Sequence, residues 1–110
     1  MRNVFHTGLE KRWDQFSLSE QMANIGAEVG RTIKWKDKGN KEMSIHAFYR
    51  ALELLDFTIN DKKNSNSLKE ILRVREALVD FFLGDNVYKS SNEIWEKYFF
   101  YFNLLSRKDK

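Results

Sequence analysis

The absence of proline is the feature that most constrains how this chain can fold. Its 110 residues include no proline and only five glycines. Proline interrupts helices because it lacks the backbone N–H and its ring clashes with the preceding turn. A chain without proline can form long helices, so the sequence favours an all-α fold.

Serine and glutamate recur three residues apart, each time just before apolar residues that repeat with helical period. This spacing is typical of a capping box, in which the serine oxygen accepts a backbone N–H and the glutamate reaches back to the serine N–H. Gly39 is suited to end the first helix in a left-handed conformation, and Asn40 to cap the next. The boxes are Ser17–Glu20, Ser67–Glu70 and Ser90–Glu93. The predicted helices cover residues 18–38, 41–59, 68–83 and 91–105.

The links between these helices set the predicted topology. The turn at Gly39 and Asn40 is so short that the helices on either side must pack antiparallel. We therefore predict an antiparallel up-down-up-down four-helix bundle over residues 17–107, preceded by a short N-terminal arm or helix at residues 1–16. The polar segment at residues 60–67, NDKKNSNS, is predicted to be a mobile loop.

The helix predicted over residues 18–38 carries a face of small residues beside its apolar stripe. Glycine inside a helix is less favourable than alanine by about 1 kcal/mol, so two glycines four residues apart need a structural reason. We expect a neighbouring backbone to approach closely along this face. The face consists of Ala23, Gly26, Ala27 and Gly30.

Charge and composition narrow the classes of function. The chain has 19 basic and 16 acidic residues, interspersed along its length, and its net charge of +3 is a small surplus for a protein that binds nucleic acid through phosphates. It has no cysteine, which excludes disulfides and thiolate metal sites. No segment approaches the ~20 apolar residues of a membrane span, and the N-terminus lacks the apolar run of a signal peptide. We expect a cytoplasmic protein that makes no membrane contact.

Two long segments of the sequence resemble a family of small, uncharacterised helical prokaryotic proteins. They are WDQFSLSEQMANIGAEVGRTIKWKDKGNKEM and LKEILRVREALVDFFLGDNVYKS. The resemblance covers the chain from about Trp13 to Leu105 and implies a bacterial or archaeal cytoplasmic origin. No activity is established for that family, so no functional residue carries over from it.

Arg75 is the residue of greatest chemical interest in the helix predicted over residues 68–83. It falls near the centre of the predicted apolar stripe, and an unpaired buried guanidinium is too costly to keep. We expect it to pair with Glu28 of the first helix or to extend its head to solvent. The alternative is a ligand-binding pocket for an anion or carboxylate, formed by Arg75, Glu28 and Arg50. The predicted stripe consists of Leu68, Ile71, Leu72, Leu78, Val79 and Phe82.

Metal and nucleic-acid sites have weaker sequence support. His46 follows Glu42 by four residues, whereas di-iron bundles use Glu-x-x-His on paired helices, so we predict no metal site and no cofactor. A cluster of basic residues surrounds Trp35, which could stack on a nucleotide base, although cations are also favourable at any helix C-terminus. This basic patch consists of Arg31, Lys34, Trp35, Lys36 and Lys38.

The helix predicted over residues 91–105 is rich in aromatic residues on its inner side and also carries apolar residues on its back. At about 100° per residue, Phe100 and Leu104 fall opposite the main apolar face, one turn apart. They are covered either by the N-terminal arm, through Phe5, Leu9, Trp13 or Phe16, or by a second protein. We favour the second interpretation because the apolar residues of the arm are few and widely spaced. The main face consists of Ile94, Trp95, Tyr98, Phe99, Tyr101, Phe102 and Leu105.

The sequence contains no nucleophile–base pair, paired catalytic carboxylates or cofactor loop that would indicate an enzyme. The function that it favours is a non-enzymatic interaction module that forms a homodimer through Phe100 and Leu104. A protein partner other than a second copy is the related alternative. The remaining hypotheses are a nucleic-acid-associated bundle that works with a partner protein, and a small enzyme or ligand-binding bundle centred on Arg75.

Overall fold

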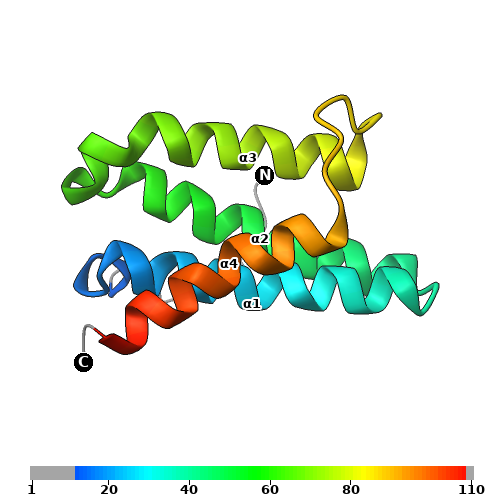
Figure 1. Cartoon of the computed structure of the whole chain (residues 1–110), viewed down its shortest axis with the longest axis horizontal. Coiled ribbons are helices and arrows are strands. Elements are labelled where there is room, and N and C mark those ends of the chain that lie inside the picture. Colours follow the sequence, from blue (N-terminus) through cyan, green and yellow to red (C-terminus); the bar gives the residue numbers. More distant parts are fainter. Residues whose placement is uncertain (1–11, 109–110) are drawn as a thin grey trace.

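The computed structural model describes residues 12–108, which form four α-helices and two short 3-10 helices, with no β-strand in that range (Figure 1). The predicted all-α fold is confirmed. The α-helices are α1 (Leu18–Asp37), α2 (Lys41–Asn60), α3 (Leu68–Leu83) and α4 (Asn92–Lys108). The 3-10 helices are η1 (Trp13–Gln15), just before α1, and η2 (Lys62–Ser67), between α2 and α3.

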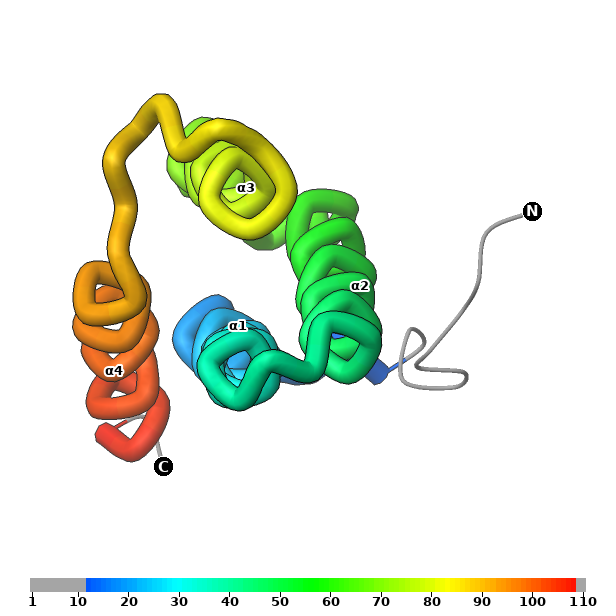
Figure 2. Tube along the Cα trace, turned by 90° about the vertical axis from the view of Figure 1, so that its right-hand side faces the viewer, coloured from blue at the N-terminus to red at the C-terminus, as the bar shows by residue number. Residues whose placement is uncertain are grey.

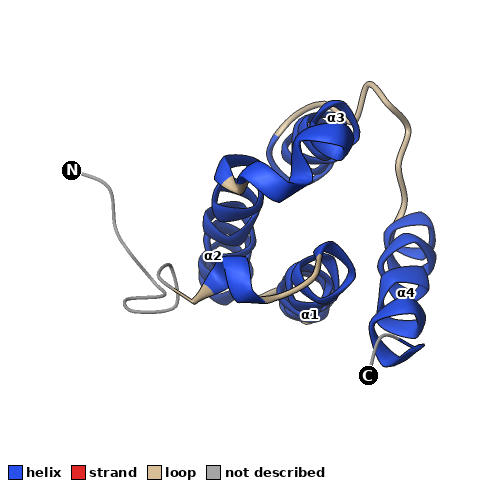
Figure 3. Cartoon of the chain, turned by 90° about the vertical axis from the view of Figure 1, so that its left-hand side faces the viewer, coloured by secondary structure: helices blue, strands red, loops and turns tan. Residues whose placement is uncertain are grey.

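The four helices alternate in direction along the chain, as Figure 1 shows. α1 and α2 form an antiparallel hairpin, α3 returns beside α2, and α4 crosses α1 obliquely on the other side. Viewed end-on, the helices follow one another in the order α3, α2, α1, α4 (Figure 2). The link from α3 to α4, residues 84–91, connects the first and last helices of this order (Figure 3). The structure is therefore a four-helix bundle in which α1 packs against both α2 and α4.

The core draws side chains from every α-helix, and the helical period explains most of them. Ile25, Phe48, Leu78 and Phe99 are all almost completely buried. In α3, however, the buried stripe is Ile71, Val74 and Leu78, whereas Leu72 is 47% exposed. The predicted stripe of α3 is therefore wrong at Leu72, because the side of α3 that meets α2 is narrow and includes Val74 instead.

The predicted caps at Ser17, Gly39 and Asn40 are confirmed. Ser17 and Glu20 form a capping box: the Glu20 N–H donates to the Ser17 side chain at 3.1 Å, and the Ser17 N–H donates to Glu20 Oε1 at 3.0 Å. Asn40 accepts from the Met43 N–H at 3.0 Å, and Gly39 has the predicted left-handed conformation, with φ of +76°. The hydrogen-bonding partners in these caps lie within one helical turn of each other, so the local sequence is sufficient to predict them.

The other two predicted capping boxes are wrong. The Ser67 side chain makes no capping hydrogen bond, because η2 leads directly into α3 and the backbone N–H of Leu68 bonds to the Ser65 carbonyl instead. α4 begins one residue later than a cap at Ser90 requires. Ser91 accepts from the Ile94 N–H at 3.2 Å, while the Ser90 N–H bonds to Asn86 Oδ1 at 2.8 Å.

The polar segment predicted to be a mobile loop instead ends α2 at Asn60 and forms η2, in which Asn64 is buried in a polar cluster. Asn64 Nδ2 donates to Gln21 Oε1 at 2.8 Å and to the Thr58 carbonyl at 3.0 Å. Gln21 Nε2 donates to the Trp13 carbonyl at 2.8 Å, and the Trp13 indole N–H donates to Thr58 Oγ1 at 2.9 Å. These four side chains connect η1, α1, α2 and η2 through hydrogen bonds that no local sequence pattern predicts.

Asp61 extends this polar cluster towards the surface. It accepts from Gln21 Nε2 at 2.9 Å and forms an ion pair with Lys63, whose ammonium also donates to the Asp14 carbonyl at 3.0 Å. Burial by itself raises the pKa of the Asp61 carboxyl, but the hydrogen bonds from Lys63 and Gln21 outweigh burial and lower that pKa below its usual value. Asp61 therefore stays ionised and holds η2 against α1.

The described part of the predicted N-terminal arm packs on α2. Trp13 is buried, with its ring centroid 6.4 Å from that of Phe57 and 5.6 Å from that of Phe16. Phe5 and Leu9 lie outside the described residues. Neither Trp13 nor Phe16 covers Phe100 or Leu104 on α4, so the covering role considered for these two residues is wrong.

Candidate functional site

Within residues 12–108, α4 carries large apolar side chains that the bundle leaves exposed. Trp95, Phe99 and Phe102 turn inward and are buried. On the opposite side, Phe100 is 57% exposed and Leu104 is 43% exposed. We use the name outer face for these two residues together with the exposed charged residues beside them: Glu93, Glu96, Lys97 and Arg107.

The apolar surface of α4 extends beyond the two predicted residues. Ile94 and Tyr101, which the helical pattern placed on the inner face, are 52% and 58% exposed. Their predicted inward position is wrong because α4 crosses α1 obliquely and buries only a narrow stripe. Two aliphatic and two aromatic side chains of one helix therefore face solvent.

Of the two glycines on the small-residue face of α1, one is in close contact with α4. A Cβ built on Gly26 would lie only 2.6 Å from the Cβ of Phe99, so the close approach expected from the glycines occurs here. It does not occur at Gly30, where an added Cβ would have no neighbour within 4 Å. The expectation for Gly30 is therefore wrong, and this glycine instead lines open space.

That open space is a groove of about 310 Å³ between α1 and α4. Its floor is formed by small residues of α1, and its wall by the aromatic side chains of α4. Phe100 belongs both to the groove and to the outer face, so the two surfaces are continuous. The groove is lined chiefly by Ala23, Gly26, Ala27, Gly30, Phe99 and Phe100.

Arg75 does not meet Glu28, and its predicted pairing is wrong. Its Nε donates to Asp56 Oδ1 of α2 at 2.9 Å, and both side chains are about one-third exposed. Because Val74 and Leu78 occupy the core side of α3, Arg75 lies at the edge of the helix interface with its head near solvent. This arrangement agrees with a structural role for Arg75.

Glu28 and Arg50, by contrast, do come together. Glu28 is largely buried, and its Oε2 accepts from Arg50 Nε at 2.8 Å. Its other oxygen forms an ion pair with Arg31, one turn along α1. Both carboxylate oxygens therefore have an arginine partner, and the cluster joins α1 to α2. The structure brings together two of the three predicted ligand-binding residues, already paired with each other.

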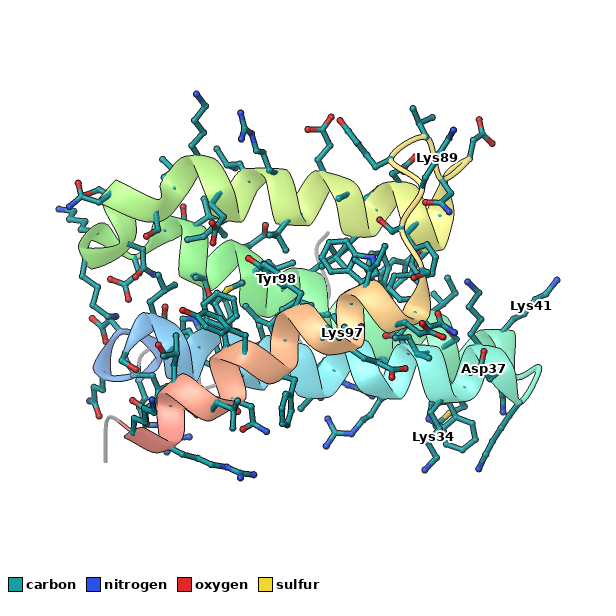
Figure 4. The ribbon with its side chains drawn as sticks, in the orientation of Figure 1. Lys34, Asp37, Lys41, Lys89, Lys97 and Tyr98 are labelled. Atoms are coloured by element: carbon teal, nitrogen blue, oxygen red, sulfur yellow. The ribbon has the colours of Figure 1, made fainter. Side chains whose placement is uncertain are left out.

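The predicted basic patch separates into three parts. Arg31 pairs with Glu28. Lys36 reaches α3, where its ammonium lies 4.4 Å from the ring centroid of Phe81 and 5.5 Å from that of Phe82. Only Lys34 and Lys38 stay beside Trp35, at 5.5 Å and 5.4 Å from its ring centroid. Figure 4 shows Lys34, Asp37 and Lys41 at the end of the molecule where α1 passes into α2.

Tyr98 joins α4 to α3 through a contact that the sequence did not predict. Its hydroxyl donates to Glu70 Oε2 at 3.2 Å, and Figure 4 shows Tyr98 among the side chains that lie over the middle of the molecule. Burial, followed by the nearby charge of Glu70, raises the pKa of the Tyr98 hydroxyl well above its usual value of 10. Tyr98 is therefore neutral at all physiological pH values.

The fold and this surface define a helical protein that presents an apolar helix face beside a groove. Within residues 12–108, no group of three or more His, Cys, Asp or Glu side chains is arranged to hold a metal ion. No helix in the same range has the length and apolar character required to cross a bilayer. No known protein family, curated protein or solved structure matches the chain. The resemblance to small helical prokaryotic proteins stays a prediction.

Proposed function

We propose that this chain is a non-enzymatic interaction module that associates with a second copy of itself through the outer face of α4. The observation that supports the proposal is the exposure of Phe100 and Leu104, one turn apart on a helix that also exposes Ile94 and Tyr101. Burying apolar surface is favourable by roughly 25 cal/mol per Å². Aromatic side chains are also enriched at the centres of protein interfaces.

The polar groups of the structure support an interaction role more than a chemical one. The ion pairs of Glu28 and Arg75 are satisfied within the bundle, so neither pair presents an open cationic site for an anionic ligand. Binding to nucleic acid also has less support, because Arg31 and Lys36 of the basic patch make intramolecular contacts. Among residues 12–108, Phe100 and Leu104 of the outer face stay exposed.

The proposal is tested by measuring the mass of the protein in solution. We expect native mass spectrometry and light scattering to report a dimer for the wild-type chain. Substituting Phe100→Glu and Leu104→Glu together places two charges in the interface and should give a monomer with unchanged helical content. Leu72→Glu is the matched control, since Leu72 is equally exposed on α3, at 47%, and should leave the dimer intact. A wild-type monomer at about 100 μM, far above a low-micromolar Kd, would overturn the proposal.

A further inference from the structure

We infer that two copies of the chain pair antiparallel along α4, with the two-fold axis beside Phe100 and Glu93 of each copy facing Arg107 of the other. This inference rests on the proposed self-association and adds its geometry. It follows from the order of charges along the outer face. Glu93, Glu96 and Lys97 lie in the first half of α4 and together carry a net negative charge, whereas Arg107 lies in its last turn.

The spacing of the charges around Phe100 sets the register. Glu93 precedes Phe100 by seven residues, and Arg107 follows it by seven. Seven residues make almost two full turns and advance by about 10.5 Å. Glu93, Phe100 and Arg107 therefore form a nearly straight line along the exposed side of α4, with the aromatic ring at the midpoint and opposite charges at equal distances from it.

Opposite charges at equal distances distinguish the two ways in which a pair of α4 helices can associate. In an antiparallel pair centred on Phe100, each Glu93 lies opposite an Arg107, which gives two ion pairs around an aromatic contact. In a parallel pair, Glu93 would face Glu93 and Arg107 would face Arg107, and like charges placed together are unfavourable. A two-fold interface uses the same patch on both copies, as this arrangement requires.

The groove beside Phe100 provides room for the pairing. Gly30 lines the groove, and nothing lies within 4 Å of where its Cβ would be. A side chain from the second copy can therefore approach α1 closely there, as Phe99 of the same chain does at Gly26. Because Phe100 also lines the groove, a second copy centred on Phe100 lies beside it, and by symmetry the same holds for the groove of the other copy.

A charge reversal tests the register. Glu93→Arg places two arginines together at each end of the interface and should raise the dimer Kd at least tenfold. The double substitution Glu93→Arg with Arg107→Glu restores opposite charges and should return the Kd to within about threefold of the wild-type value. If these charges only complemented the dipole of α4, the double variant would be less helical and would not recover. Failure of the double variant to recover would overturn the register.

Glu42→Arg is the matched control for the single reversal. Glu42 is exposed in the first turn of α2, so its replacement perturbs a helix dipole in the same way without changing α4. We expect the dimer Kd of this variant to stay within about threefold of the wild-type value. A loss of affinity equal to that of Glu93→Arg would show that the effect is a general one of charge, and would also overturn the register.

Cross-linking tests the direction independently, because the natural chain has no cysteine. Glu93→Cys and Arg107→Cys proteins are treated with a short bis-maleimide, separately and as an equal mixture. Antiparallel pairing predicts a cross-linked dimer in the mixture only. Cross-linking of each variant by itself would indicate parallel pairing and overturn this inference, while leaving self-association through α4 in place. A wild-type chain that is monomeric throughout would overturn both proposals.

Discussion

Phe99 packs directly onto Gly26, whereas Gly30, one turn further along α1, has no neighbour at the position of a Cβ. The two glycines therefore have opposite structural roles. Gly26 allows α4 to lie against α1. Gly30 leaves open the groove that we assign to the second copy.

These roles predict stability changes of opposite sign. Gly26→Ala should lower the free energy of unfolding by about 1 kcal/mol, because the overpacking against Phe99 outweighs the gain in helix propensity. Gly30→Ala should raise it by up to about 1 kcal/mol, because only the propensity gain remains. Urea denaturation in the Phe100→Glu, Leu104→Glu background measures both without the contribution of the dimer. Equal effects at the two positions would contradict the close approach at Gly26.

Asn64 should be among the most sensitive polar residues of the bundle. Asn64→Ala leaves the buried Gln21 Oε1 without its donor and removes one of the two donors to the Thr58 carbonyl, so we expect a loss of about 2 kcal/mol in the free energy of unfolding. Asn66→Ala is the control, since Asn66 is exposed in the same 3-10 helix, and it should change the stability by less than about 0.5 kcal/mol. Thermal unfolding of the two variants decides whether η2 depends on this polar cluster.

The ion pair of Arg75 should contribute little to stability. Both partners are about one-third exposed, and an exposed pair typically contributes about 0.2–1 kcal/mol. A double-mutant cycle with Arg75→Met and Asp56→Asn should therefore give a coupling energy below about 1 kcal/mol. A coupling of several kcal/mol would instead indicate that Arg75 is buried in the core, as its place in the sequence pattern suggested.

We expect the protein to lose stability in alkaline solution because of Tyr98. Its pKa in the folded protein is raised above the unfolded value near 10, so its contribution is present below pH 10 and decreases as the pH rises above 10. Between pH 9 and pH 11, Tyr98→Phe should lose less stability than the wild-type protein does. Tyr49→Phe is the control for the loss of a hydroxyl, because Tyr49 is 45% exposed on α2 and lies away from α4.

The structural features that sequence reasoning predicts well are those decided within one helical turn. Ser17, Gly39 and Asn40 lie where the local pattern places them because their partners are three or four residues away. The exposure of Phe100 was predictable for a similar reason, since the helical period alone places it opposite Trp95 and Phe102. The fold class follows from the same local signals.

Contacts between distant segments were not predictable in this way. Whether Leu72 or Val74 enters the core depends on the line along which α3 meets α2, and the helical period permits either. The carboxylate that pairs with Arg75, and the burial of Asn64 in a wholly polar segment, depend on partners 19 and 43 residues away. The groove next to Gly30 depends on where α4 crosses α1. The local sequence does not determine that crossing point.

The docking of α4 on α1 also constrains the order in which the chain can fold during synthesis. α1 and α2 can pair as soon as both have left the ribosome, because they are adjacent in sequence. The contact between Gly26 and Phe99 cannot form until Phe99, 73 residues further along the chain, has been synthesised. Until then one side of α1 stays open to water and to other nascent chains, so this side is where a chaperone would be expected to bind the unfinished protein.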